Sequence, residues 1–318
     1  MPADYRRANP ESIPQWRAWV IAARPHVKPA GLAPVIVGTG LAVHYGVFAL
    51  WPAVAALLGA LLIQTGTDFA NDYFDYTKGV DSDDSAGYLR VSQSGLIPAR
   101  RVFAAAVACY SLAFILGIYL VSIGGLPIVI VGLASIASGF AYSGGPYPIG
   151  SHALGDAFVF LFFGVIAVAG TYYVQASHVL LDSMPLWVQP GTLSVAVIVA
   201  SLPMAGLTTN ILVVNNIRDI EDDRAAGKRT LAVLLGRRWS RVEYVVLTAL
   251  AYVVPVWFFA VSAVGPAVLL PLLSLPLAVS AIRKVMTGTN TETLNPALER
   301  TGQLVVVFGA LFALGLVV

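Results

Sequence analysis

Residues 67–75 read Thr67-Asp68-Phe69-Ala70-Asn71-Asp72-Tyr73-Phe74-Asp75, and they end an apolar run that begins at residue 52. Asp68, Asn71, Asp72 and Asp75 share one stripe of a helix, because each helical residue turns by about 100°. Ionisable groups at membrane depth are costly and normally face a bundle interior or a water-filled cavity. The stripe therefore predicts a membrane-crossing helix whose end faces a polar chamber.

The composition of the whole chain supports a membrane protein. Of the 318 residues, 58% are hydrophobic and only 11% are charged. Soluble domains are about 45–50% apolar and about 25% charged, so the composition excludes a soluble globule, and this apolar content also excludes a disordered chain. The single cysteine, Cys109, excludes a disulfide framework and a zinc cluster. A net charge of +2 gives no reason to expect nucleic acid as a partner.

About nine segments have the length and apolarity of a membrane-crossing helix, which needs about 20 mostly apolar residues. They lie near residues 30–49, 52–74, 102–122, 125–143, 154–175, 192–214, 243–262, 265–282 and 301–318. We predict an all-α, polytopic membrane protein with about nine transmembrane helices around a central cavity that opens to the cytosol. Residues 1–29 are predicted to be a cytosolic, interface-lying segment, and residues 30–318 to form one transmembrane domain.

A second acidic segment lies 144 residues further along the chain. It reads Asn215-Asn216-Ile217-Arg218-Asp219-Ile220-Glu221-Asp222-Asp223. Asn71 and Asp75 match Asn215 and Asp219, because 215 − 71 and 219 − 75 both equal 144. We interpret this as a pseudo-repeat of two four-helix halves, about 30–143 and 154–282, with a ninth helix at about 301–318. The repeat predicts that the two segments face each other across one cavity.

The basic residues predict how the helices are oriented. Cytosolic connections of membrane proteins carry an excess of Lys and Arg. With a cytosolic N-terminus, all 19 Lys and Arg residues fall in the N-terminal segment or in the inner connections 75–101, 144–153, 215–242 and 283–300. The outer loops carry one formal charge, Asp182. We therefore expect a multi-pass protein of the cell membrane with both acidic segments on the cytosolic side.

The residue types of the two segments suit a metal ion bound together with a diphosphate. Mg²⁺ prefers oxygen ligands and is typically held by one or two carboxylates plus substrate phosphates. Interleaved basic residues can neutralise the remaining phosphate oxygens: Lys78, Arg90, Arg218, Arg224, Lys228 and Arg229. The alternative is an ordinary solvated connection, which is how we interpret Asp83, Asp84 and Glu221.

Two longer motifs resemble those of the UbiA superfamily of membrane prenyltransferases. They are NDYFDYTKGVD at residues 71–81 and NNIRDIEDDRAAGKRTL at residues 215–231. The stretches SGGPYP at 143–148 and ALGD at 153–156 are similar to the branch that prenylates 1,4-dihydroxy-2-naphthoate in menaquinone biosynthesis. The resemblance covers nearly the whole chain, from about residue 16 to residue 318.

This resemblance implies an activity. The expected reaction is Mg²⁺-dependent transfer of a polyprenyl group from polyprenyl diphosphate to 1,4-dihydroxy-2-naphthoate, which releases diphosphate and CO2 and gives demethylmenaquinone. The expected partners are these two substrates and the lipid bilayer, and the expected cofactor is Mg²⁺.

The resemblance also implies roles for single residues. Metal and diphosphate coordination is expected of Asn71, Asp75, Asp81, Asn215, Asp219 and Asp223, and the expected catalytic groups are Asp72, Asp75 and Asp219. Asp68 and Asp72 either bind a second metal ion or assist deprotonation of the naphthol. The expected diphosphate contacts are Lys78, Arg218, Lys228 and Arg229, with Arg90 as a weaker one.

The chain departs from the superfamily ahead of the ALGD stretch. Many members carry Lys or Arg there, whereas this chain has Gly150-Ser151-His152. His152, Tyr142 and Tyr147 are therefore candidate contacts to the aromatic substrate. The alternative for each is a membrane-interface side chain without a role in the reaction.

Other functions are open at this point. A membrane transporter also combines repeats with intramembrane carboxylates, although here the acids lie at helix ends. A phosphotransferase of the CDP-alcohol type would need a DGxxAR element, which the sequence lacks. Within the superfamily, the acceptor could be another phenol such as 4-hydroxybenzoate.

Overall fold

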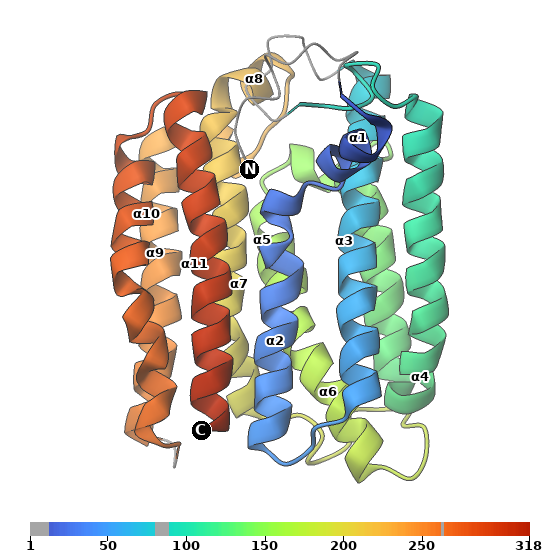
Figure 1. Ribbon diagram of the computed structural model, residues 1–318, viewed down its shortest axis with the longest axis vertical. Helices are drawn as coiled ribbons and strands as arrows, with labels where there is room; N and C mark the ends of the chain where they lie inside the picture. Colours follow the sequence, from blue (N-terminus) through green and yellow to red (C-terminus); the bar gives the residue numbers. More distant parts are fainter. Residues whose placement is uncertain (1–12, 80–88, 262–263) are drawn as a thin grey trace.

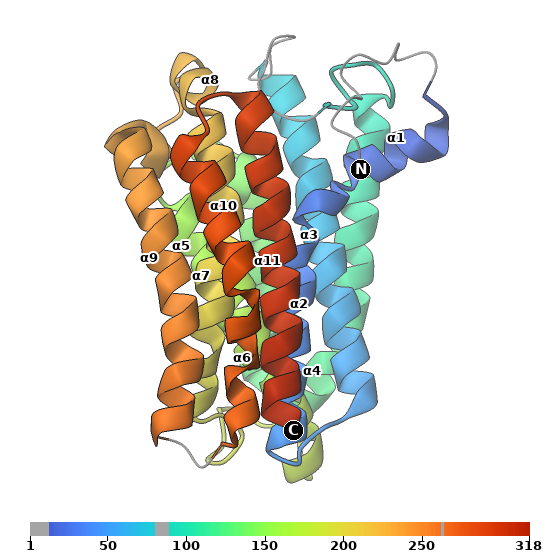
Figure 2. The ribbon, with the colours of Figure 1, turned by 60° about the vertical axis from the view of Figure 1, so that its left-hand side comes forward.

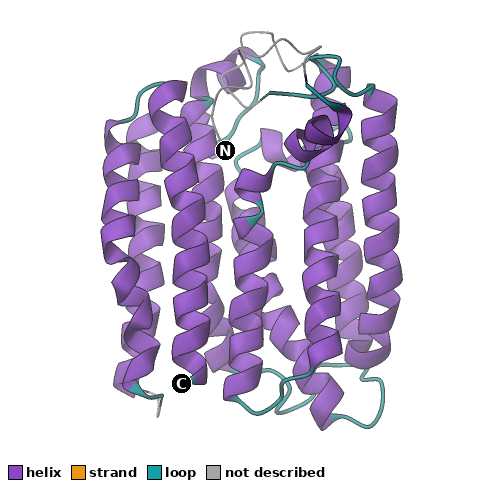
Figure 3. Cartoon of the chain, in the orientation of Figure 1, coloured by secondary structure: helices purple, strands orange, loops and turns teal. Residues whose placement is uncertain are grey.

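The protein is a bundle of long helices that run side by side (Figures 1 and 3). The computed structural model describes residues 13–79, 89–261 and 264–318. These residues form helices, turns and loops, and no β-strand is found among them. The prediction of an all-α fold is confirmed.

The long helices match the predicted apolar segments. Their bounds are α2 Pro29–His44, α3 Leu50–Lys78, α4 Ala99–Ser143, α5 Gly155–Val159, α6 Ala167–Leu180, α7 Val195–Arg218, α9 Leu231–Val261, α10 Leu275–Thr287 and α11 Thr291–Val317. A π-helical segment, Phe160–Ile166, joins α5 to α6, and a 3-10 segment, Pro266–Ser274, leads into α10. The remaining helices are α1 (Gln15–Ala22) and α8 (Ile220–Ala225), and short 3-10 segments lie at Pro25–Val27 and Ile149–Ser151.

Within the described residues, seven helices are long and apolar enough to cross a membrane, or eight if the bent pair Gln15–Val27 and Pro29–His44 is one span. The predicted number of nine is therefore not confirmed. One reason is α4, which is counted as one helix although it includes both of the segments predicted at 102–122 and 125–143.

The chain of α4 turns back on itself at Gly125. A straight helix rises 1.5 Å per residue, so Tyr110 and Phe140 would lie about 45 Å apart. Their ring centroids are only 5.2 Å apart. Gly125 has φ 64° and ψ −151°, a conformation that residues with a side chain rarely adopt. The reversal makes α4 a helical hairpin, with its turn held by a hydrogen bond from the Leu126 amide to the Pro185 carbonyl at 3.1 Å.

Two helices begin earlier than the sequence predicts. α9 starts at Leu231 rather than 243, and α11 starts at Thr291 rather than 301. Helix α11 is begun by a capping box, in which the Asn290 side chain accepts from the Thr293 amide at 3.1 Å. Charged residues that were predicted to be loops therefore lie on helices, because capping satisfies the free amides at a helix start.

Helix α7 lies at the centre of the largest apolar core. Met204, Leu207 and Ile217 are fully buried, and they pack in one cluster with residues of α2, α6, α9 and α11. Helices α3 and α7 both finish at the end of the bundle where α8 lies, the upper end in Figure 1. The ends of the two acidic segments are therefore on the same side of the molecule.

Helix α1 lies across this end, at a steep angle to the bundle (Figure 2). The Gln15 side-chain amide donates to the Leu96 carbonyl at 3.3 Å, and the Trp19 ring meets the Phe69 ring edge-on at 5.8 Å. The N-terminal segment thus packs on the loop that follows α3.

We predict that Gly125→Ala destabilises the protein by about 2 kcal/mol or more, because its side chain would require a positive φ and would overlap the Pro185 carbonyl oxygen. The matched control is Gly132→Ala, which meets open space on the second arm of α4. The stability of both variants is measured as the midpoint of thermal unfolding in detergent. Equal unfolding midpoints for the two variants would contradict the role given to Gly125.

Candidate active site

The two acidic segments line one polar cavity of about 260 Å³. The acidic and amide side chains that these segments contribute are Asp68, Asn71, Asp75, Asn215, Asn216, Asp219 and Asp223, and Gln64 also lines the cavity. The first three lie on α3, the next two on α7, and Asp219 and Asp223 on or beside α8. The predicted meeting of the two segments in one chamber is therefore present in the structure.

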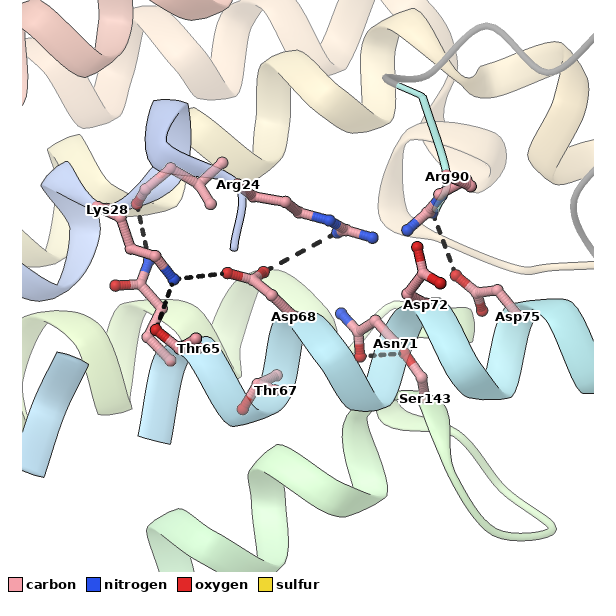
Figure 4. A network of polar contacts seen from close by, with 12 residues as sticks. Arg24, Lys28, Thr65, Thr67, Asp68, Asn71, Asp72, Asp75, Arg90 and Ser143 are labelled. Atoms are coloured by element: carbon pink, nitrogen blue, oxygen red, sulfur yellow. Dashed lines mark hydrogen bonds and ion pairs between the residues drawn. The ribbon is translucent and has the colours of Figure 1, made fainter. Parts of the chain in front are cut away.

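On α3, the carboxylates of Asp68 and Asp75 are paired with basic side chains (Figure 4). Asp68 accepts from the Lys28 ammonium at 2.9 Å, with the Arg24 guanidinium at 3.9 Å on its other oxygen. Asp75 lies 3.2 Å from an Arg90 nitrogen. Asn71 accepts from the Ser143 hydroxyl at 2.5 Å, which links α3 to the end of α4.

The second segment repeats this arrangement. Arg218 binds Asp219 through two nitrogens at 2.7 and 2.8 Å, and it donates to the Asn295 side chain of α11 at 3.0 Å. Asp223 lies 3.1 Å from the Lys228 ammonium. Burial raises the pKa of the Asp223 carboxyl, and the charge of Lys228 acts in the opposite direction.

Charges of the two signs are balanced in the cavity. Four aspartates (Asp68, Asp75, Asp219 and Asp223) and four basic residues (Arg24, Arg90, Arg218 and Lys228) are among its described lining residues. Each aspartate lies within ion-pair distance of a Lys or Arg. A ligand that carries both a cation and an anionic group could exchange these pairs for contacts of its own, at little net change in charge.

The donor set fits a magnesium ion that is bound with a phosphate ligand. No group of three or more His, Cys, Asp or Glu residues converges on one point within the described residues. The oxygens instead lie in small sets on the two sides of the cavity. Mg²⁺ is suited to this arrangement, because it keeps waters and commonly takes one or two carboxylates plus substrate phosphates.

Asp72 has a different environment from the other acids of its stripe. Its two carboxylate oxygens accept from the backbone amides of Ser92 and Val91, at 3.0 and 3.2 Å. The side chain is 3% exposed, and it is absent from the lining of the polar cavity. These contacts favour a role in holding the loop that carries Arg90, rather than the predicted role in catalysis.

Four predicted substrate contacts lie outside the lining of this cavity. Lys78 donates to the carbonyls of Ser143 and Gly145, at 2.7 and 3.3 Å. Tyr147 is 65% exposed and stacks on His152 at 3.7 Å. Arg229 is exposed, and its backbone amide donates to the Ser151 carbonyl at 2.8 Å. The geometry does not favour direct substrate binding by these four, and Asp81 lies outside the described residues.

Arg24 and His26 line the polar cavity but are absent from the predicted site. Arg24 has φ 47°, the one positive φ among the described residues other than glycine. Its Nη2 atom is buried without a hydrogen-bond partner among those residues. The sequence carried one signal, the Arg24-Pro25 pair ahead of the first span, which also agrees with the family resemblance but was given no role in the predicted site.

A larger apolar cavity of about 660 Å³ adjoins the polar one. Its lining includes Ile63, Leu120, Ile128, Phe158 and Phe162, from α3, both arms of α4 and the segments before α6. Four residues line both cavities: Thr67, Tyr142, Val159 and Phe163. Of the three predicted contacts to the aromatic substrate, only Tyr142 reaches the site.

Comparisons with known proteins agree with this arrangement. Residues 31–297 match the UbiA prenyltransferase family model, and the chain belongs to that family. It is 36% identical to the 1,4-dihydroxy-2-naphthoate octaprenyltransferase of Mycobacterium tuberculosis, over 91% of this chain and 93% of that protein.

Solved structures share the fold. A UbiA homolog from Aeropyrum pernix K1 superposes with a TM-score of 0.69 at 13% identity, over 90% of this chain and 96% of the other. A UbiA homolog from Archaeoglobus fulgidus, bound to DMAPP and Mg²⁺, superposes with a TM-score of 0.59 at 15% identity, over 92% of this chain and 98% of the other.

We predict that Asp72→Asn frees the loop after α3, because each carboxylate oxygen accepts one backbone N–H and the amide nitrogen that replaces one of them cannot accept. A hydrogen bond to a charged group is worth about 1.5–3 kcal/mol. Hydrogen–deuterium exchange at Val91 and Ser92 should rise. Glu221→Gln is the control, since its exposed carboxylate contacts Arg224 instead. Unchanged exchange in Asp72→Asn would show that Asp72 does not hold the loop.

Proposed function

We propose that this protein transfers a polyprenyl group from polyprenyl diphosphate to 1,4-dihydroxy-2-naphthoate, with Mg²⁺ as cofactor. The observation that carries the proposal is the contact between the two cavities. A charged cavity suited to a metal-bound diphosphate shares four lining residues with an apolar one suited to an isoprenoid tail. The named acceptor of the Mycobacterium tuberculosis relative supports the choice of aromatic substrate.

The main task of such a site is to stabilise the leaving diphosphate. The allylic C–O bond breaks with both electrons moving to the diphosphate oxygen. Bound Mg²⁺ would neutralise that developing charge, held by oxygens of Asp68, Asn71 and Asp75 on one side and of Asn215, Asp219 and Asp223 on the other. The basic groups placed to take the remaining phosphate oxygens are Arg24, Arg90, Arg218 and Lys228.

The rest of the reaction takes place away from water. An allylic cation would be trapped by water as an alcohol, and the apolar lining of the larger cavity excludes water from it. The ring carbon that bears the carboxylate forms the new C–C bond. CO2 then leaves, and its bonding electrons return to the ring. The balanced product is the reduced, quinol form of demethylmenaquinone.

The orientation in the membrane is part of the proposal. The described basic side chains of both segments gather at the end of the bundle that carries α1 and α8. Because cytosolic connections are rich in Lys and Arg, we assign this end to the cytosolic side of the cell membrane. Water-soluble diphosphate would then be released into the cytosol.

The reaction is tested by incubating purified protein with Mg²⁺, a polyprenyl diphosphate and single aromatic acids, with product identification by mass. We expect transfer to 1,4-dihydroxy-2-naphthoate with loss of CO2, none to 4-hydroxybenzoate, and none after chelation of the metal. Transfer to 4-hydroxybenzoate alone would replace the proposed acceptor. A protein that moves a solute across vesicles but forms no prenylated product would be a transporter.

We predict that Asp75→Asn and Asp219→Asn each lower the turnover number by about 100-fold or more, because each removes a negative oxygen from the diphosphate site. The control is Glu221→Gln, whose carboxylate is exposed and paired with exposed Arg224. Unfolding midpoints verify that the variants fold. Retained turnover in Asp75→Asn or Asp219→Asn would contradict the assignment of that residue.

A further inference from the structure

The boundary between the two cavities determines where the reacting carbon lies. A prenyl diphosphate bound as proposed has its charged group in the polar cavity and its tail in the apolar one. Its allylic C1 atom then lies among the four residues that line both cavities, Thr67, Tyr142, Val159 and Phe163. An aromatic carbon must come within about 3–3.5 Å of C1 to react. The acceptor ring therefore has to occupy the same boundary.

Two of these four residues carry a hydroxyl group, and only one hydroxyl is available. The Thr67 hydroxyl donates to the Ile63 carbonyl at 2.9 Å and lies 3.0 Å from the Tyr110 hydroxyl. The Tyr142 hydroxyl has no hydrogen-bond partner among the described residues, although its ring lines both cavities. Hydroxyl groups inside proteins are normally hydrogen-bonded. The Tyr142 hydroxyl is thus the group at this boundary that a ligand can satisfy.

The surroundings hold the Tyr142 ring in place. A Cβ atom at Gly150 would come within 2.6 Å of Tyr142 Cε1, so only glycine allows the chain to approach this face of the ring. Gly155, at the start of α5, also lies close to this side chain. A Cβ atom at Gly155 would lie 3.5 Å from the Tyr142 hydroxyl oxygen. The loop between α4 and α5 therefore fixes the ring, which lowers the entropy cost of using it to orient a substrate.

The segment that carries the two apolar residues of the boundary has an irregular backbone. Val159 ends α5, and the π-helical segment that follows contains Phe163. Such π-helical turns are rare and frequently occur at functional sites. Val159 and Phe163 add apolar side chains to a boundary that also carries the Tyr142 hydroxyl, and this combination suits an aromatic ring with a polar substituent on one edge.

We propose that this boundary is the acceptor subsite, and that the Tyr142 hydroxyl donates a hydrogen bond to the acceptor's ring hydroxyl next to the attacked carbon. The inference rests on the proposed function and adds the residue that positions its aromatic substrate. Tyr142 transfers no proton in this role. It holds the ring so that the attacked carbon faces C1 of the prenyl group, with Val159 and Phe163 against the ring.

The test is the steady-state kinetics of Tyr142→Phe with both substrates varied. Loss of one hydrogen bond to a neutral group should raise KM for 1,4-dihydroxy-2-naphthoate about tenfold. KM for the prenyl diphosphate should stay within about twofold, since its charged group contacts other residues. Tyr119→Phe is the matched control, because that tyrosine lies on the exposed side of α4 and outside both cavities. Its two KM values should equal those of the wild type.

A second variant tests the subsite without removing the hydroxyl. Val159→Leu narrows the boundary beside the acceptor ring, so KM for 1,4-dihydroxy-2-naphthoate should rise while Mg²⁺ and prenyl diphosphate together still raise the unfolding midpoint. Unchanged acceptor KM in either variant, or an equal rise of both KM values in Tyr142→Phe, would overturn the inference. A wild-type protein that prenylates no aromatic acid would instead refute the proposed function itself.

Discussion

The structure depends on pairing charges inside an apolar bundle. Each aspartate that lines the polar cavity has a lysine or arginine at ion-pair distance, and the partners come from several elements. Lys28 precedes α2, Arg90 lies on the loop after α3, and Lys228 follows α8. An unpaired carboxylate in such surroundings would be strongly destabilising. The need to pair these charges therefore brings distant parts of the chain to one end of the molecule.

The same pairing prepares the site for its ligand. A magnesium-bound diphosphate offers cationic charge to the carboxylates and anionic charge to the lysine and arginine side chains. Binding can then exchange one set of ion pairs for another. The protein therefore does not have to bury unpaired charges in this cavity before the ligand binds. Because the groups are already in position, little reorganisation accompanies the breaking of the C–O bond, which is the basis of electrostatic catalysis.

Much of the site could be predicted from the residue pattern. The helical spacing of Asn71 and Asp75 and its repetition in Asn215 and Asp219 predicted two facing segments, and all four residues line the cavity. The pattern could not separate Asp72 from this stripe, since its amide partners lie about 20 residues away on a loop. It also could not show that Lys78 binds backbone carbonyls of the α4–α5 connection, because that contact needs the hairpin of α4.

Apolar run lengths and the placement of acids were enough to determine an all-α membrane protein with a polar chamber at one end, because burying an isolated charge in lipid costs too much to occur by chance. The tertiary structure alone decided which side chains reach that chamber. Arg24 enters it through a left-handed backbone turn, and Tyr142 enters it because the chain reverses at Gly125 and closes on Gly150. Such contacts join residues far apart in sequence, and no periodicity within a single helix can encode them.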